Sequence, residues 1–232
     1  MKASIYSNQT LIGHTDLRPG DAAMGGVYGE FIPTVDYYRS VQKTVWEFNA
    51  NTSPDYTAWQ ALALNVQLEN GYFLFPMGGY SFDDNVKFPN EPIQVYLAGI
   101  AAEILEDFIS FDPPRTFVEE PWEALTIAQK LALEAEFGRE WGNIFKSPLA
   151  SAGSSSVVVG AQFSALCRLG TTDDVLFSVR ESAAFTSPFA LVHLTWSGRQ
   201  EQNLSFPKMI FFNSFAEFKL ERMYPDRSDW EY

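Results

Sequence analysis

His193 and three aspartates are the residues whose types are suited to acid–base or metal chemistry. His193 lies in the apolar run 190–196, which follows Asp173 and Asp174 in the chain and precedes Asp226. An imidazole with one or more of these carboxylates can form a metal site or an acid–base pair. A lone histidine among apolar strand residues is more often structural, with its ring hydrogen-bonded to a neighbouring carboxylate or carbonyl group. We favour this structural interpretation and leave a chemical role for His193 open.

Asp173 and Asp174 are candidates for a catalytic carboxylate pair because they are adjacent in the chain. Neighbouring residues at the start of a strand point to opposite sides of the sheet, whereas an acid–base dyad needs its two carboxylates together. We therefore predict that both aspartates are turn residues, with an acidic contact to a partner protein as their second role.

The other reactive side chains lack the neighbours that catalysis needs. Cys167, the only cysteine, lies in the apolar segment 163–169 without a nearby base, and we predict that it is buried. Ser154–Ser156 lacks the glycines of a nucleophile elbow. His14, two residues before Asp16, is open to interpretation as a weak metal ligand, but we favour an exposed turn histidine.

The segment from 13 to 29 holds five glycines, a density that can indicate a phosphate-binding loop. It has neither a P-loop lysine nor the spacing of a dinucleotide-binding loop, and its aspartates would repel an anion. We interpret it as a tight turn with glycines at positive φ. The sequence thus predicts no catalytic residue, no metal ligand and no cofactor, and we expect that the protein is not an enzyme.

Two strands must position His193 and the adjacent aspartates. Residues 175–179 alternate between the two faces of a strand, and residues 190–196 form a second strand after the polar excursion 181–188. The period of two places His193 on the same face as Leu191. We also expect strands at 157–159 and 209–212.

Two capping boxes predict helices in this half, Thr126–Gln129 and Ser214–Glu217. In the second helix, Phe215 and Phe218 should face inward. In the first, the spacing predicts a buried side made of Ile127, Ala128, Leu131, Ala132 and Ala135.

The first half shows a different series of elements. Residues 3–6 and 10–12 should form a hairpin, Thr34 should cap a helix, and Asn70-Gly71 should join two antiparallel strands. Phe111–Arg115 contains two prolines and is the best candidate boundary. We therefore predict an α+β protein of two small domains, 1–112 and 116–232, each an antiparallel sheet packed with helices.

The composition favours a protein partner over nucleic acid or a membrane. The 232 residues carry a net charge of −13, and the acids are distributed over both halves. An acidic surface repels nucleic acid and anionic lipid and attracts a basic partner. We find no apolar stretch of signal-peptide or membrane-spanning length, and expect a cytoplasmic protein.

Aromatic residues make up 16% of the chain, which is more than two small domains can bury completely. Some should therefore be exposed, and exposed aromatics surrounded by carboxylates are typical of a protein-binding face. We predict that Asp83, Asp84, Asp173 and Asp174 contribute to partner binding.

The two halves each resemble a small uncharacterised bacterial family. Leu11-Ile12-Gly13, Gly20-Asp21, Met24-Gly25 and Phe31-Ile32-Pro33 carry the first resemblance, with Ala22-Ala23 standing where that family usually has prolines. Asp173-Asp174-Val175-Leu176-Phe177, Val192-His193-Leu194-Thr195-Trp196, Pro207 and Asp226 carry the second. Neither family supplies a catalytic residue to carry over.

Small acidic proteins of this type resemble the immunity proteins encoded beside bacterial polymorphic toxins. The resemblance implies an inhibitor that binds a cognate basic toxin or effector domain and occludes its active site. Two alternatives stay open: a structural or scaffold protein of a secretion or phage-related locus, and a small-molecule hydrolase or nuclease. The oligomeric state is also open.

Overall fold

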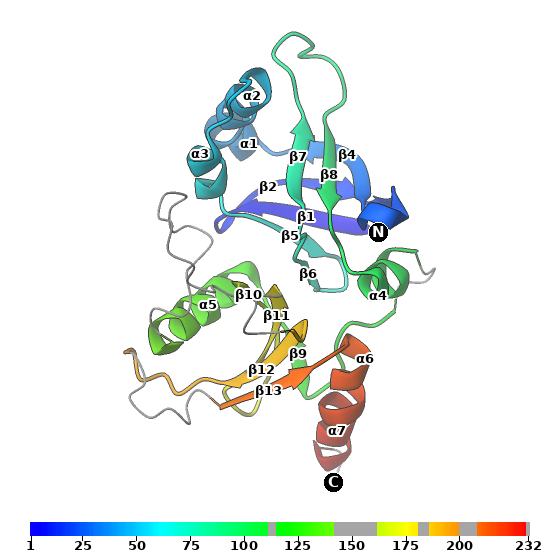
Figure 1. Ribbon diagram of the computed structural model, residues 1–232, viewed down its shortest axis with the longest axis vertical. Helices are drawn as coiled ribbons and strands as arrows, with labels where there is room; N and C mark the ends of the chain where they lie inside the picture. The colour runs from blue at the N-terminus through cyan, green and yellow to red at the C-terminus, as the bar shows by residue number, and fades with distance from the viewer. Residues whose placement is uncertain (111–114, 142–161, 181–185, 200–207, 231–232) are drawn as a thin grey trace. The chain divides into compact units, whose positions relative to one another are not determined.

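The computed structural model describes residues 1–110, 115–141, 162–180, 186–199 and 208–230 (Figure 1). The described residues form two compact units, Met1–Arg115 and the residues from Thr116 onward. Each unit contains an antiparallel sheet with helices, so the predicted α+β class is confirmed. The expected strand at 157–159 and the serines at 154–156 lie outside the described residues.

The N-terminal unit is built on an antiparallel sheet in the order β6-β5-β1-β2-β4-β8-β7, with β3 paired to β4. Its strands are β1 (Lys2–Ser7), β2 (Thr10–Asp16), β3 (Arg18–Pro19), β4 (Val27–Pro33), β5 (Leu64–Leu68), β6 (Phe73–Leu74), β7 (Gly79–Asp83) and β8 (Gln94–Ala98). The predicted hairpins are both present: β1 pairs with β2, and β5 pairs with β6 across Asn70-Gly71.

Helices α1 (Val35–Ser40), α2 (Gln42–Ala50) and α3 (Tyr56–Ala61) lie side by side in this unit (Figure 1). The predicted cap is confirmed, since Thr34 Oγ1 accepts a hydrogen bond from Asp36 N–H. Tyr37 of α1 is buried against Phe31 and Phe82, so this helix covers the inner face of β4 and β7. Shorter helical segments are η1 (Ala22–Met24), α4 (Ala102–Ile104) and η2 (Leu105–Ser110).

The glycine-rich segment is not the single tight turn that we predicted. Gly25 has a positive φ of 57°, but Gly13 and Gly29 lie within strands β2 and β4. A Cβ atom at Gly13 would lie 2.2 Å from the Phe31 ring, and one at Gly29 would lie 2.4 Å from Thr15 Oγ1. These two positions therefore require glycine because the neighbouring strand packs too closely for a side chain. Their backbone conformation would allow other residues.

The second unit contains a five-stranded antiparallel sheet in the order β13-β12-β11-β10-β9. Its strands are β9 (Trp122–Ala124), β10 (Gln162–Leu169), β11 (Asp174–Arg180), β12 (Phe189–His193) and β13 (Lys208–Phe212). The predicted strands pair as β11 and β12, but β12 ends at His193 and not at Trp196, and Asp174 lies in β11 and not in a turn. Asp174 lies directly opposite His193. This register, and not the sequence separation, brings the aspartate to the histidine.

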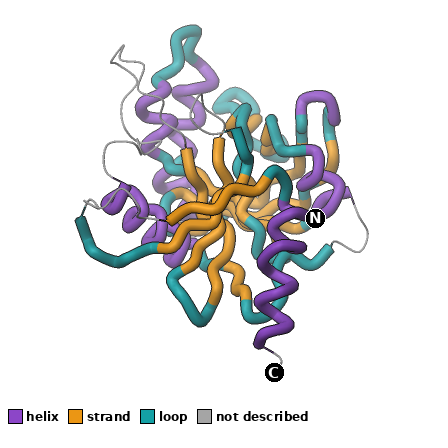
Figure 2. Tube along the Cα trace, turned by 60° about the horizontal axis from the view of Figure 1, so that its bottom comes forward, coloured by secondary structure: helices purple, strands orange, loops and turns teal. Residues whose placement is uncertain are grey.

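Helices cover both faces of this sheet. Helix α5 (Ile127–Trp141) places Phe137 against Phe177 of β11. On the opposite face, Phe189 and Phe212 pack against a C-terminal helix made of α6 (Phe215–Phe218), η4 (Lys219–Met223) and α7 (Tyr224–Trp230). Figure 2 shows these three segments as one continuous helical rod that ends at the C-terminus.

The buried side of α5 differs from the predicted one. Ala128, Ala132 and Ala135 are exposed, and the buried positions are Lys130, Leu133, Glu136, Phe137 and Glu140. Three charged residues face inward because hydrogen bonds satisfy them there: Lys130 Nζ donates to Ser164 Oγ at 2.8 Å, for example. Both predicted caps nevertheless form, at Thr126–Gln129 and at Ser214–Glu217.

Candidate functional site

Two buried carboxylates of α5 hold the loop that follows β12. Glu140 accepts hydrogen bonds from the backbone N–H groups of Thr195 at 2.9 Å and Trp196 at 2.6 Å. Glu136 accepts from the N–H of Gly198 at 3.1 Å. Because hydrogen bonds to a charged group are stronger than those between neutral groups, these contacts fix the loop to the helix.

Burial pushes the pKa of Glu136 upward, but hydrogen bonds from Arg139 and from Gly198 N–H outweigh this effect. The pKa of Glu136 is therefore lowered, and the carboxylate stays ionised as an acceptor for the loop.

Trp196 is the residue that this loop presents. Its φ of 53° lies in the left-handed region, which costs a non-glycine residue about 1–3 kcal/mol. The side chain is 49% exposed, and its ring nitrogen Nε1 donates to Asp173 Oδ1 at 2.8 Å. Backbone and ring are thus both anchored, so a large aromatic surface is held toward solvent in one orientation.

His193 and Asp174 form a second, neighbouring group. His193 Nδ1 lies 2.9 Å from Asp174 Oδ1, and the imidazole is 45% exposed. Arg222 of η4 lies 3.6 Å from the other oxygen of Asp174 and also 3.6 Å from Asp226 Oδ2. Asp226 in turn accepts from Trp122 Nε1 at 3.0 Å, so the network joins the sheet to the C-terminal helix.

The three candidate aspartates have different partners. His193 contacts Asp174, whereas Asp173 accepts a hydrogen bond from Trp196 on the other side. Among the described residues, Arg222 links Asp226 to Asp174. A guanidinium between two carboxylates disfavours a metal cation there. Within the described residues, no group of three or more His, Cys, Asp or Glu side chains is placed to hold a metal ion.

The two residues of the other predicted contact pair, Asp83 and Asp84, also differ in their surroundings. Asp83 is exposed at the end of β7, whereas Asp84 is only 5% exposed. The Asp84 carboxylate accepts from Tyr37 Oη at 2.7 Å, Trp46 Nε1 at 2.9 Å and Gln42 Nε2 at 3.1 Å. A side chain in this state cannot meet a partner, so we assign Asp84 a structural role instead of a contact role.

Comparison with protein-family models, curated proteins and solved structures returned no match. The family resemblance therefore stays a prediction, and only the residues and their geometry bear on function.

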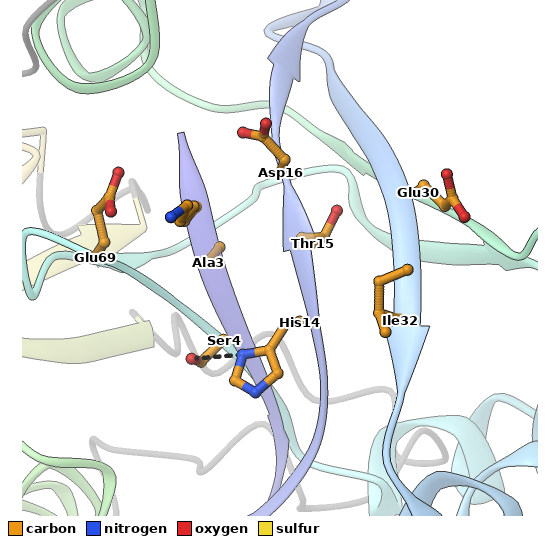
Figure 3. A pocket seen from close by; sticks show the side chains of 9 residues that line it. Ala3, Ser4, His14, Thr15, Asp16, Glu30, Ile32 and Glu69 are labelled. Carbon is orange, nitrogen blue, oxygen red and sulfur yellow. Dashed lines mark hydrogen bonds between the residues drawn. The ribbon is translucent and has the colours of Figure 1, made fainter.

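His14 lies in strand β2 and not in a turn. It borders a depression of about 470 Å³ on the solvent-facing side of β1, β2 and β4 (Figure 3). The lining residues are Lys2, Ala3, Ser4, His14, Thr15, Asp16, Glu30, Ile32 and Glu69. Ser4 Oγ lies 3.3 Å from His14 Nδ1, so the imidazole nitrogen that a carboxylate would orient in a catalytic triad faces the serine instead. We assign no reaction to this depression.

Cys167 is buried in β10, as predicted. Burial raises the pKa of its thiol well above the usual value, which keeps it protonated and unreactive. No helix among the described residues is long and apolar enough to cross a membrane.

Sequence reasoning missed the residues that hold the site, namely Glu136, Glu140 and Arg222. The only available signal was a set of acidic residues one turn apart on α5. Such residues usually belong to a solvated helix face, and nothing local distinguishes these from that case.

Proposed function

We propose that this protein is an inhibitor of the immunity type, which binds a basic toxin or effector domain and occludes its active site. The observation that supports it most directly is Trp196, half-exposed and anchored through both its backbone and its ring. Tryptophan is enriched at the energetic centres of protein interfaces, and a side chain that is already ordered loses little entropy on binding.

The charge of the protein supports the same partner class. A net charge of −13 attracts a basic domain over a distance of about one Debye length and speeds the encounter. In this proposal the acids set the association rate, and Trp196 slows dissociation. We expect the inhibitor to act in the cytoplasm and to bind neither nucleic acid nor membrane.

The chemistry next to Trp196 supports a binding role more than a catalytic one. Asp174 orients His193 through Nδ1, which is also how a carboxylate orients a general base. The same carboxylate, however, faces Arg222 and connects the sheet to the C-terminal helix, which is a structural use. A scaffold role remains the second candidate, and it differs from inhibition in predicting a complex without loss of toxicity.

The experiment is co-expression with the product of the adjacent gene. We expect that product to be toxic alone, harmless with this protein present, and to elute with it from a sizing column. Trp196→Ala should weaken the complex by about 2 kcal/mol or more, chiefly through faster dissociation, with little change in melting temperature.

Trp230→Ala is the matched control, because Trp230 is another exposed tryptophan of the same unit, 57% exposed on α7. It should leave the affinity within about 0.5 kcal/mol of the wild type. Continued toxicity with no complex would refute the inhibitor proposal, and a complex that leaves the toxin active would favour the scaffold role.

A further inference from the structure

The two aspartates beside the candidate site are in different electrostatic states. Asp174 is only 18% exposed and faces both His193 and Arg222. Asp173 is exposed, and in the described part of the chain its carboxylate meets no lysine or arginine within ion-pair distance. The uncompensated negative charge at this surface therefore belongs to Asp173.

The indole ring of Trp196 lies directly beside this charge. The 2.8 Å bond from Nε1 to Asp173 Oδ1 places the carboxylate at the edge of the ring. A cation over the ring face is attracted by the negative face of the π system and, a few ångströms away, by the carboxylate. The two attractions add, since both favour a positive group in the same place.

The arrangement of the indole ring and the carboxylate favours arginine over lysine. A guanidinium is planar, so it can stack on the indole face while its N–H groups point toward the carboxylate at the ring edge. It is also more weakly hydrated than an ammonium group, which lowers the cost of bringing it against an aromatic ring. The net charge of −13 favours a partner that carries such residues.

We propose that the partner's anchor is an arginine side chain that stacks on Trp196 and pairs with Asp173. This inference rests on the proposed function in assuming a protein partner, but the surface itself can be tested without one. We exclude Asp174 from the contact because its carboxylate already faces His193 and Arg222 within the protein.

The test is a titration of the intact protein with N-acetyl-arginine amide, followed through the indole N–H resonances in NMR spectra. The indole resonances of Trp196 and Trp230 are assigned by their disappearance in the variants Trp196→Phe and Trp230→Phe. We expect the Trp196 resonance to move in a saturable manner, with the Trp230 resonance unaffected. The neutral analogue N-acetyl-citrulline amide should not move it, and N-acetyl-lysine amide with a free side-chain amine should bind more weakly than arginine.

Asp173→Asn isolates the charge, because an asparagine oxygen still accepts the bond from Trp196 Nε1. It should weaken arginine binding by up to about fivefold, the upper end of the range for an exposed ion pair. Asp229→Asn removes the same charge from an exposed position on α7 and should leave arginine binding unchanged.

An equal response to arginine and citrulline, or equal loss in both aspartate variants, would overturn the proposal. The outcome is separable from that of the proposed function. A positive titration with no toxic adjacent gene product leaves the arginine site standing and removes the inhibitor. A neutralised toxin without an arginine response supports the inhibitor and removes the arginine site.

Discussion

The Asp84 carboxylate is the acceptor through which α1 and α2 are attached to the end of β7. Its donors are Tyr37 of α1 together with Gln42 and Trp46 of α2. Burial raises the pKa of Tyr37, and the hydrogen bond to Asp84 raises it further, so the phenol remains a donor far into the alkaline range. A charged acceptor buried with three donors is stable only while those donors are present.

Replacing Asp84 with alanine should lower the free energy of unfolding by about 2–5 kcal/mol, because the buried Tyr37 hydroxyl and its neighbours lose their acceptor. Urea denaturation followed by circular dichroism measures this change. Asp83→Ala is the adjacent exposed control and should cost no more than about 0.5 kcal/mol. Equal effects of the two substitutions would show that Asp84 is not the structural acceptor that we infer.

At the scale of elements, α5 acts as the support of the Trp196 loop. Its carboxylates reach across the chain to backbone groups 55 and 62 residues away. The helix also packs Phe137 against the sheet. The position of the loop is therefore set by its attachment through α5 to the core of the unit. An aromatic residue held in this way can act as a preformed contact.

Glu140→Ala should release the loop without unfolding the unit. The N–H groups of Thr195 and Trp196 would lose a charged acceptor, and their hydrogen exchange should accelerate at least about tenfold. Partner binding should weaken as well, because Trp196 would no longer be held at positive φ. Glu221→Ala, an exposed acid on η4, is the control and should leave exchange at the loop unchanged. Unchanged exchange in the Glu140 variant would contradict the supporting role of α5.

At the scale of the whole molecule, the described residues divide into two compact units near Arg115. The segment 111–115 contains the prolines that led us to predict a boundary there. Only a few residues further on, Phe117 and Trp122 are already enclosed in the second unit. Proteases cut preferentially in the segments between compact units, where few contacts cross.

Limited proteolysis of the intact protein should therefore cut within about residues 111–121 and leave two fragments that each retain a cooperative unfolding transition. Mass spectrometry locates the cut, and circular dichroism measures the transitions. Resistance in this segment, together with a single transition for the whole chain, would show that the halves fold as one domain.

The sequence by itself determined the helix caps and hairpins of this protein. Capping at Thr126 and the hairpin at Asn70-Gly71 depend on residues within four positions of one another, which a linear pattern records completely. The period of two likewise assigns Asp173 and Asp174 to opposite sides of the sheet, because alternation along a strand is a local property.

Only the tertiary structure decided which charges are buried and which are presented. Asp84 and Asp83 are chemically equivalent in sequence, and so are Glu140 and any acid on a solvated helix face. Their roles depend on donors that arrive from distant segments, such as Tyr37 for Asp84 and the Trp196 loop for Glu140. Desolvation and hydrogen bonding at long sequence separation are set by packing, and for that reason the anchored tryptophan became visible only in three dimensions.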